Sequence, residues 1–135
     1  MITRFAFLIV AGLATTAAAQ EVDPEAGRDL FMSYCWQCHG HEATGNGPMA
    51  EMIAIETPDL TRLASRNGGV FPLEAVAQKI DGRASVLSHG GEMPIFGPFL
   101  ETDKLVALPL PSGQPMMTGL PLAQLLVYLE ILQVK

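Results

Sequence analysis

The feature that most constrains this chain is a short string near its N-terminal end, Cys35-Trp36-Gln37-Cys38-His39. The chain has 135 residues and two cysteines, and both cysteines lie in this string, called here the cysteine motif. On a helix, residues three and four apart are neighbours on one face. A helical motif would therefore project two thiols and one imidazole together from a single turn.

This spacing suits the attachment of haem. Two thiols three residues apart can add to the two vinyl groups of one haem, and the imidazole can then bind the iron. We therefore expect one covalently bound haem c, attached through Cys35 and Cys38, with His39 as an axial ligand of the iron. The other ring nitrogen of this histidine needs an acceptor that fixes its tautomer. The carbonyl groups near Pro48 and Pro58 are the candidates.

Three other roles are open to such a cysteine pair. A thioredoxin-like redox site belongs in a βαβ context, which the sequence around the motif does not indicate. A zinc site would need a second pair of ligands, and the chain has no further cysteine. A structural disulfide is the third alternative. Haem is favoured because the motif uses both cysteines and adds a histidine at the ligand position.

The second axial ligand of the iron would decide its chemistry, and methionine raises the reduction potential relative to a second histidine. Met93 is the favoured candidate, because Pro94 biases it away from helix and nearby glycines let the backbone approach a flat ring. The rivals are Met49, Met52, Met116 and Met117, with His89 from another ligand class.

The N-terminal segment predicts export. Arg4 precedes a short apolar run from Phe5 to Ala14, and small residues follow up to Ala19. This order of regions is typical of a secretory signal peptide with an Ala-x-Ala cleavage site. We expect residues 1–19 to be removed and residues 20–135 to form one domain in a bacterial periplasm, where cysteines can be attached to a cofactor. No later run is long and apolar enough to span a bilayer.

The composition excludes several classes of protein. Hydrophobic residues make up 49% of the chain and charged residues 16%, which is too apolar for a disordered protein. A length of 135 residues is too short for a multidomain enzyme. A net charge of −6 leaves too few cations for nucleic-acid binding. With two cysteines, a scaffold of several disulfides is also excluded.

Hydrophobic spacing and capping residues predict four helices, over residues 24–37, 59–67, 72–81 and 121–133. Asp23 and Asp59 are the expected N-caps, glycines at 68 and 69 end the second helix, and Gly82 ends the third. A short turn of helix is expected within residues 49–55, and another short helix from Thr102 to Leu108. No segment predicts a convincing sheet. Long loops in a small domain need something to pack against, which a large apolar cofactor would supply.

Together these features resemble a class I cytochrome c of the single-haem, bacterial type. Gly27 and Phe31 precede the cysteine motif as in the first helix of that family. The run Met93–Gly97 is similar to its Met-Pro-x-aromatic-Gly ligand loop, and Tyr128 and Leu129 lie where its last helix would cross the first. The resemblance implies an all-α cytochrome c-like fold of short helices and long loops wrapped around one covalently attached haem.

In that family a glycine lets the first and last helices approach closely. We expect contacts between Gly27 or Phe31 on one helix and Leu125, Tyr128 or Leu129 on the other. The chain departs from a minimal family member in its long Pro/Met-rich segment Leu105–Leu120, which would shield the haem or contact a partner. It also lacks the lysine ring of the mitochondrial branch, so acidic partners are not implied.

The resemblance also implies how the haem is held. His39 and Met93 would fill both axial sites of the iron, so no bond to a substrate would form. The haem propionates need cationic donors. Arg62, Arg66 and Arg83 are the candidates, because arginine forms forked hydrogen bonds to carboxylates.

The sequence therefore predicts a periplasmic one-electron carrier rather than an enzyme. Its acidic charge favours redox partner proteins with basic or apolar contact regions. We expect a monomer that forms transient complexes with these partners through small interfaces. One alternative is a haem-bearing electron-transfer subunit of a periplasmic dehydrogenase or oxidase complex. Another is a gas-binding or peroxidatic haem protein with an open sixth site.

Overall fold

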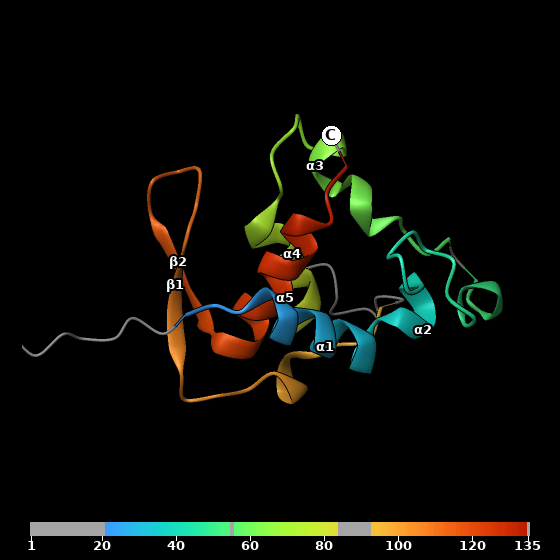
Figure 1. The fold of residues 1–135 in the computed structure, drawn as a ribbon, viewed down its shortest axis with the longest axis horizontal. Coiled ribbons are helices and arrows are strands. Elements are labelled where there is room, and N and C mark those ends of the chain that lie inside the picture. Colours follow the sequence, from blue (N-terminus) through green and yellow to red (C-terminus); the bar gives the residue numbers. More distant parts are fainter. Residues whose placement is uncertain (1–20, 55, 84–92, 135) are drawn as a thin grey trace, which may run out of the picture.

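The computed structural model describes residues 21–54, 56–83 and 93–134, so the predicted signal peptide lies outside the described residues. The described chain forms short helices and one β-hairpin (Figure 1). The α-helices are α1 (Pro24–Tyr34), α2 (Trp36–His39), α3 (Leu63–Arg66), α4 (Leu73–Asp81) and α5 (Leu120–Ile131). Short 3₁₀ turns cover Ala50–Met52, Leu60–Arg62 and Gly97–Phe99, and the strands are β1 (Leu105–Pro109) and β2 (Pro115–Gly119).

The predicted first helix is two helices, α1 and α2, separated at Cys35. The carboxylate of Asp23 caps α1 as expected, accepting a hydrogen bond from the backbone N–H of Glu25 at 2.9 Å. Cys35 has φ −113° and ψ −34°, but its N–H still donates to the Phe31 carbonyl at 2.8 Å. The N–H of His39 in turn donates to the Cys35 carbonyl at 3.0 Å. The cysteine motif therefore forms its own helical turn directly after α1.

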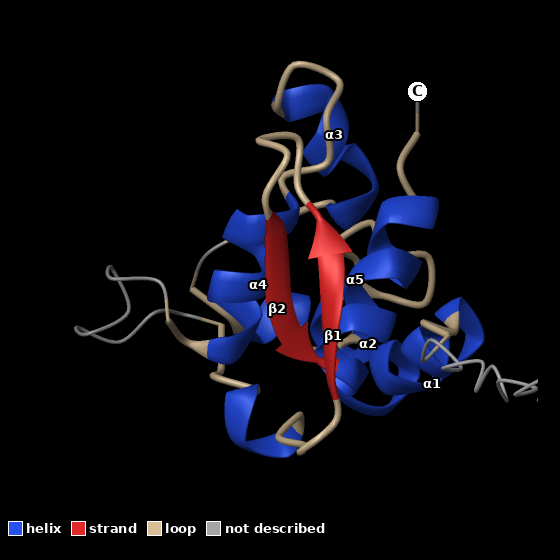
Figure 2. Ribbon diagram, turned by 90° about the vertical axis from the view of Figure 1, so that its left-hand side faces the viewer, coloured by secondary structure: helices blue, strands red, loops and turns tan. Residues whose placement is uncertain are grey.

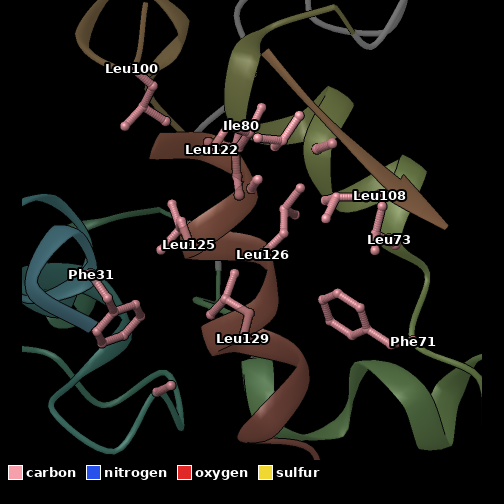
Figure 3. Packing of buried hydrophobic residues seen from close by; sticks show 14 of the residues in the cluster. Phe31, Phe71, Leu73, Ile80, Leu100, Leu108, Leu122, Leu125, Leu126 and Leu129 are labelled. Carbon is pink, nitrogen blue, oxygen red and sulfur yellow. The ribbon is translucent and has the colours of Figure 1, made fainter. Parts of the chain in front are cut away.

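Helix α5 is the centre of the hydrophobic core (Figure 3). It is apolar around most of its circumference, which is the pattern of a helix buried on several sides. Phe31 of α1 lies on one side of α5, and Phe71 and Leu108 lie on the other (Figure 3). Neither α5 nor any other helix in the described part of the chain is long and apolar enough to cross a membrane.

Helices α1 and α5 approach each other closely at Gly27. A Cβ atom added there would overlap the backbone carbonyl of Gln124 and lie 2.9 Å from the Cβ of Tyr128. The rings of Phe31 and Tyr128 are also in contact, with centroids 5.6 Å apart. The predicted contact between the first and last helices is therefore confirmed.

The helix predicted from Thr102 to Leu108 is wrong, because Leu105–Pro109 is the strand β1. It pairs antiparallel with β2 in a two-stranded ribbon that crosses one face of the molecule (Figure 2). Val106 and Leu108 are buried while their neighbours are exposed, which is the period of two of a strand. The ribbon packs this buried face against α5, and that burial decides the conformation. The fold is therefore helical apart from one hairpin.

The other predicted helices form, with small changes in their bounds. Gly82 ends α4 in the left-handed conformation, with φ 86° and ψ 8°. Asp59 caps the next turn as expected, and its carboxylate accepts from the N–H of Thr61 at 2.9 Å. The predicted helix over 59–67 is a 3₁₀ turn followed by α3, closed where the N–H of Gly69 donates to the Ala64 carbonyl at 2.8 Å.

Candidate haem site

One cavity, of about 780 Å³, brings the cysteine motif and the predicted ligand loop together. Cys35, Cys38 and His39 line it from α2 and the residue before it, and Met93 lines it from a separate segment. Its volume lies within the range of roughly 300–1,000 Å³ that is usual for cofactor sites. The fold therefore gathers two thiols, an imidazole and a thioether around one space.

The walls of this cavity are mostly apolar. They come from α1, α4, α5 and the segment that leads into α3. The apolar lining residues include Phe31, Leu60, Leu63, Val76, Ile80, Leu125 and Leu129. Such walls suit a large flat cofactor, since they bury its faces and exclude water. They also explain how this small domain holds long loops, because the loops pack around the same space.

The histidine of the motif is oriented by a backbone carbonyl. His39 is 7% exposed, and its Nδ1 lies 3.2 Å from the carbonyl oxygen of Pro58, to which it donates. Of the two acceptors that the sequence offers, Pro58 is therefore the one used. This bond leaves Nε2 free to bind a metal. Burial lowers the pKa of His39 although the Pro58 bond acts in the other direction, so the neutral ligand form is favoured.

Two sets of hydrogen bonds hold the Pro58 carbonyl in place. Behind the motif, the N–H of Gly45 donates to the His39 carbonyl at 2.8 Å, and the N–H of Gly47 donates to the Cys38 carbonyl at 3.0 Å. After Pro58, the side chain of Gln133 donates to the Leu60 carbonyl at 2.8 Å. Gln133, which sequence reasoning missed, thereby ties this loop to the end of α5.

Both cysteines are free and partly buried. Burial raises the pKa of the Cys35 thiol to about 11, and the nearby charge of Cys38 adds to the shift. A thioredoxin-like site belongs in a βαβ context, whereas the sheet in the described residues is a two-stranded antiparallel hairpin, which argues against such a site. Within the described residues, no group of three or more His, Cys, Asp or Glu residues could hold a zinc ion.

Met93 is half-buried and packs against the core. The loop after it is fixed to α4, because the N–H of Phe96 donates to the Ile80 carbonyl at 2.8 Å. A Cβ at Gly97 would lie 2.6 Å from the Asp81 carbonyl oxygen, so glycine lets the loop approach the end of α4. Met93 is thus presented from a segment well separated in sequence from the cysteine motif.

The rivals of Met93 lie elsewhere, with one exception. Met49 also lines the cavity, but its N–H donates to the Gln37 carbonyl at 2.8 Å, which ties it to the turn that carries His39. Met52 is 77% exposed. Neither Met52 nor the methionines of the hairpin, Met116 and Met117, line the cavity. The other rival, His89, lies outside the described residues.

None of the three arginines predicted to bind the propionates lines the cavity. Arg62 forms an ion pair with Asp59 at 3.4 Å, and Arg66 donates to the Asp59 carbonyl at 3.4 Å. Arg83 forms an ion pair with Asp81. The role of these arginines stays a prediction.

A different cation, Lys79, lines the cavity and was missed by sequence reasoning. It lies three residues after Val76 on α4, and residues at this spacing share a face of a helix. Val76 also lines the cavity, so the helical spacing between the two residues was the sequence signal that could have identified Lys79. Trp36, whose place the sequence left open, stacks on His41 with ring centroids 4.5 Å apart, and neither ring lines the cavity.

The donor set fits a haem: two thiols, an oriented imidazole and a thioether line one mostly apolar cavity. The family model described as Cytochrome c matches residues 24–105, which include the cysteine motif and Met93. Comparisons with curated proteins and with solved structures find no match. The family match covers more than half of the chain and ends where β1 begins. The chain belongs to the cytochrome c family, whose members bind haem c covalently.

Proposed function

We propose that the protein is a periplasmic one-electron carrier in which His39 and Met93 bind the two axial sites of a single haem iron. One observation carries this proposal: Cys35, Cys38, His39 and Met93 all line the same mostly apolar cavity. The family supports the coarser statement that the chain is a haem-based electron carrier. If His39 and Met93 both bind the iron, it would have no open position for a substrate.

The bound haem supplies an iron that exchanges one electron between its ferric and ferrous states. The residues of the chain hold the haem and set its reduction potential. The Pro58 carbonyl orients the ring of His39, and this kind of contact also makes the imidazole more basic. The apolar walls exclude water and disfavour the extra positive charge of the ferric state, which raises the reduction potential. A thioether from Met93 acts in the same direction.

We infer that redox partners bind at an aromatic cluster beside the cavity. Tyr34, Phe96 and Phe99 lie with ring centroids 6.0 to 6.4 Å apart. Tyr34 and Phe96 line the cavity, and Phe99 is 65% exposed. An apolar contact at Phe99 would bring a partner close to the haem. The net charge of −6 favours a partner with basic residues around that contact.

The β-hairpin favours a second candidate function, that of a haem-bearing subunit of a periplasmic dehydrogenase or oxidase complex. Its outer face is apolar, with Leu105 60% and Met117 54% exposed. Residues 105–129 contain no charged side chain, and no residue of the hairpin lines the haem cavity. A larger subunit bound there would leave the cavity free. Size-exclusion chromatography of the holoprotein, alone and with a candidate enzyme, separates a free carrier from a stable subunit.

The first experiment is an absorption spectrum of the exported protein, oxidised and reduced, before and after denaturation. We expect haem that stays attached in denaturant and a weak far-red band from a ferric iron–sulfur bond to methionine. The intact mass should equal one haem plus a chain that starts at Gln20. The double variant Cys35→Ala, Cys38→Ala is the control and should lose covalent haem.

The outcomes separate the candidate functions. Covalent haem without the far-red band would mean that the sixth ligand is histidine or absent, which contradicts the assignment of Met93. Binding of carbon monoxide to the ferrous protein would then identify an absent ligand, and would favour gas binding or peroxidatic chemistry over the proposed carrier. A protein that carries no haem, produced in a strain able to attach it, would make the cysteine pair a dithiol and would contradict the proposed carrier.

A further inference from the structure

The charged groups of the haem cavity are few. Among the described residues that line it, Lys79 is the one cation and Glu56 the one carboxylate. The other titratable side chains are Tyr34 from α1 and Cys35, Cys38 and His39 from the cysteine motif. The thiols are consumed by haem attachment, and the histidine is the expected iron ligand. Among the described residues, Lys79 and Glu56 are therefore the two lining groups whose charge a bound haem would meet.

Lys79 has no partner for its charge among the described residues, where it forms no ion pair and no side-chain hydrogen bond. By contrast, Arg62 and Arg83 are paired with carboxylates, and Arg66 donates to a backbone carbonyl. Lys79 is exposed as well as lining the cavity, so the residue lies where the cavity meets the surface.

We propose that Lys79 on α4 binds a propionate of the haem. This inference rests on the proposed function, since it requires a haem in this cavity. A haem carries two carboxylates on one edge of an otherwise apolar ring. An ionised carboxylate in apolar surroundings is costly unless it is paired. The ammonium group of Lys79 is a compact positive charge that can pair with such a carboxylate. The carboxylate of Glu56 would repel a propionate from the side of the cavity that Glu56 lines.

This pairing has a consequence for the reduction potential. A positive charge beside the haem favours the ferrous state, which carries one positive charge fewer, and therefore raises the potential. It also lowers the pKa of the propionate and so keeps the propionate ionised at neutral pH. Lys79 would thus hold the potential up and keep it nearly independent of pH around neutrality.

The test is a titration of midpoint potential against pH in the holoprotein. We expect Lys79→Gln to lower the potential at pH values where the propionate is ionised. The pH at which the propionate ionises should rise by about one unit or more. Lys79→Arg keeps the charge and should behave as wild type. Lys79→Met is a second neutral variant of similar length, which guards against a folding defect specific to glutamine.

Lys104→Gln is the matched control, since Lys104 is an exposed lysine outside the cavity lining. The proposal predicts a wild-type titration for this variant. It is overturned if Lys79→Gln and Lys79→Met titrate as wild type, or if Lys104→Gln changes the titration as much as the Lys79 variants do. A wild-type protein without covalent haem or without a reversible potential would instead refute the proposed function.

Discussion

At the scale of single residues, hydrogen bonds decide which atoms of the site remain available. The Nδ1 of His39 is occupied by the Pro58 carbonyl, so Nε2 is the nitrogen left for iron. The Pro58 carbonyl belongs to the loop between two short 3₁₀ turns and not to a helix. The chemistry of the motif therefore depends on the segment that folds over it.

Met93→Ala is expected to leave the haem covalently attached but to open the iron to added ligands. The ferrous variant should bind one carbon monoxide per haem, whereas the wild type should resist binding because both axial sites are filled. The midpoint potential should fall, since the thioether is lost. Carbon monoxide titration followed by absorption spectroscopy measures the binding.

Two methionine variants serve as controls for this prediction. Met52→Ala changes a side chain that is 77% exposed and lies outside the cavity lining, and it should behave as wild type. Met49→Ala removes the rival that lines the cavity. If Met49→Ala opens the iron and Met93→Ala does not, the ligand assignment is wrong.

At the scale of elements, the crossing of α1 and α5 holds the cavity wall together. Phe31 of α1 and Leu125 and Leu129 of α5 are core residues that also line the cavity. The close approach at Gly27 sets the distance between the two helices. A change in this distance would move the wall of the haem site as well as the core.

Gly27→Ala is therefore expected to destabilise the holoprotein, by about 1–3 kcal/mol for an overpacked core position. Alanine gains roughly 1 kcal/mol of helix propensity over glycine, but the added Cβ meets the backbone of Gln124, which cannot rotate away as a side chain can. Guanidinium unfolding followed by haem absorption measures the loss. Asp29→Ala, on an exposed site of the same helix, should cost much less. Equal unfolding midpoints for the two variants would show that the crossing tolerates a side chain.

At the scale of the whole molecule, the chain combines a net charge of −6 with several large apolar side chains that are exposed. Phe99 is one of them, and its ring continues an aromatic cluster that reaches the haem cavity. Ile131, which is 64% exposed against 65% for Phe99, lies outside that cluster and outside the cavity lining. The two residues form a matched pair for testing where partners bind.

Phe99→Ser is expected to slow electron transfer to an electrode that imitates the surface of a redox partner. Ile131→Ser is expected to leave that rate unchanged. The probe is an electrode coated with a mixed layer of methyl and ammonium end groups, which imitates an apolar contact with a basic rim. A loss of about 1.4 kcal/mol of apolar contact corresponds to a roughly tenfold slower rate. The wild-type rate should also fall as salt is added, because charge steers the encounter. Equal rates for both variants would place partner contact away from the aromatic cluster.

The local features of this protein were predictable from its sequence. The spacing of the cysteine motif is short-range, so the placement of two thiols and one imidazole on a single helical turn follows from it. The caps at Asp23 and Asp59 and the stop at Gly82 also form as predicted, since each depends on a few neighbouring residues. The crossing at Gly27 was expected from the family resemblance, and it forms.

Tertiary structure decided what depends on segments that are far apart in the chain. Pro58 rather than Pro48 accepts the bond of His39, because the loop is tied to the end of α5. Residues 105–109 form a strand, because α5 offers a surface that buries every second side chain. Lys79 lines the cavity, whereas side-chain chemistry alone favoured the arginines, because the packing of α4 around the site determines which charges face it.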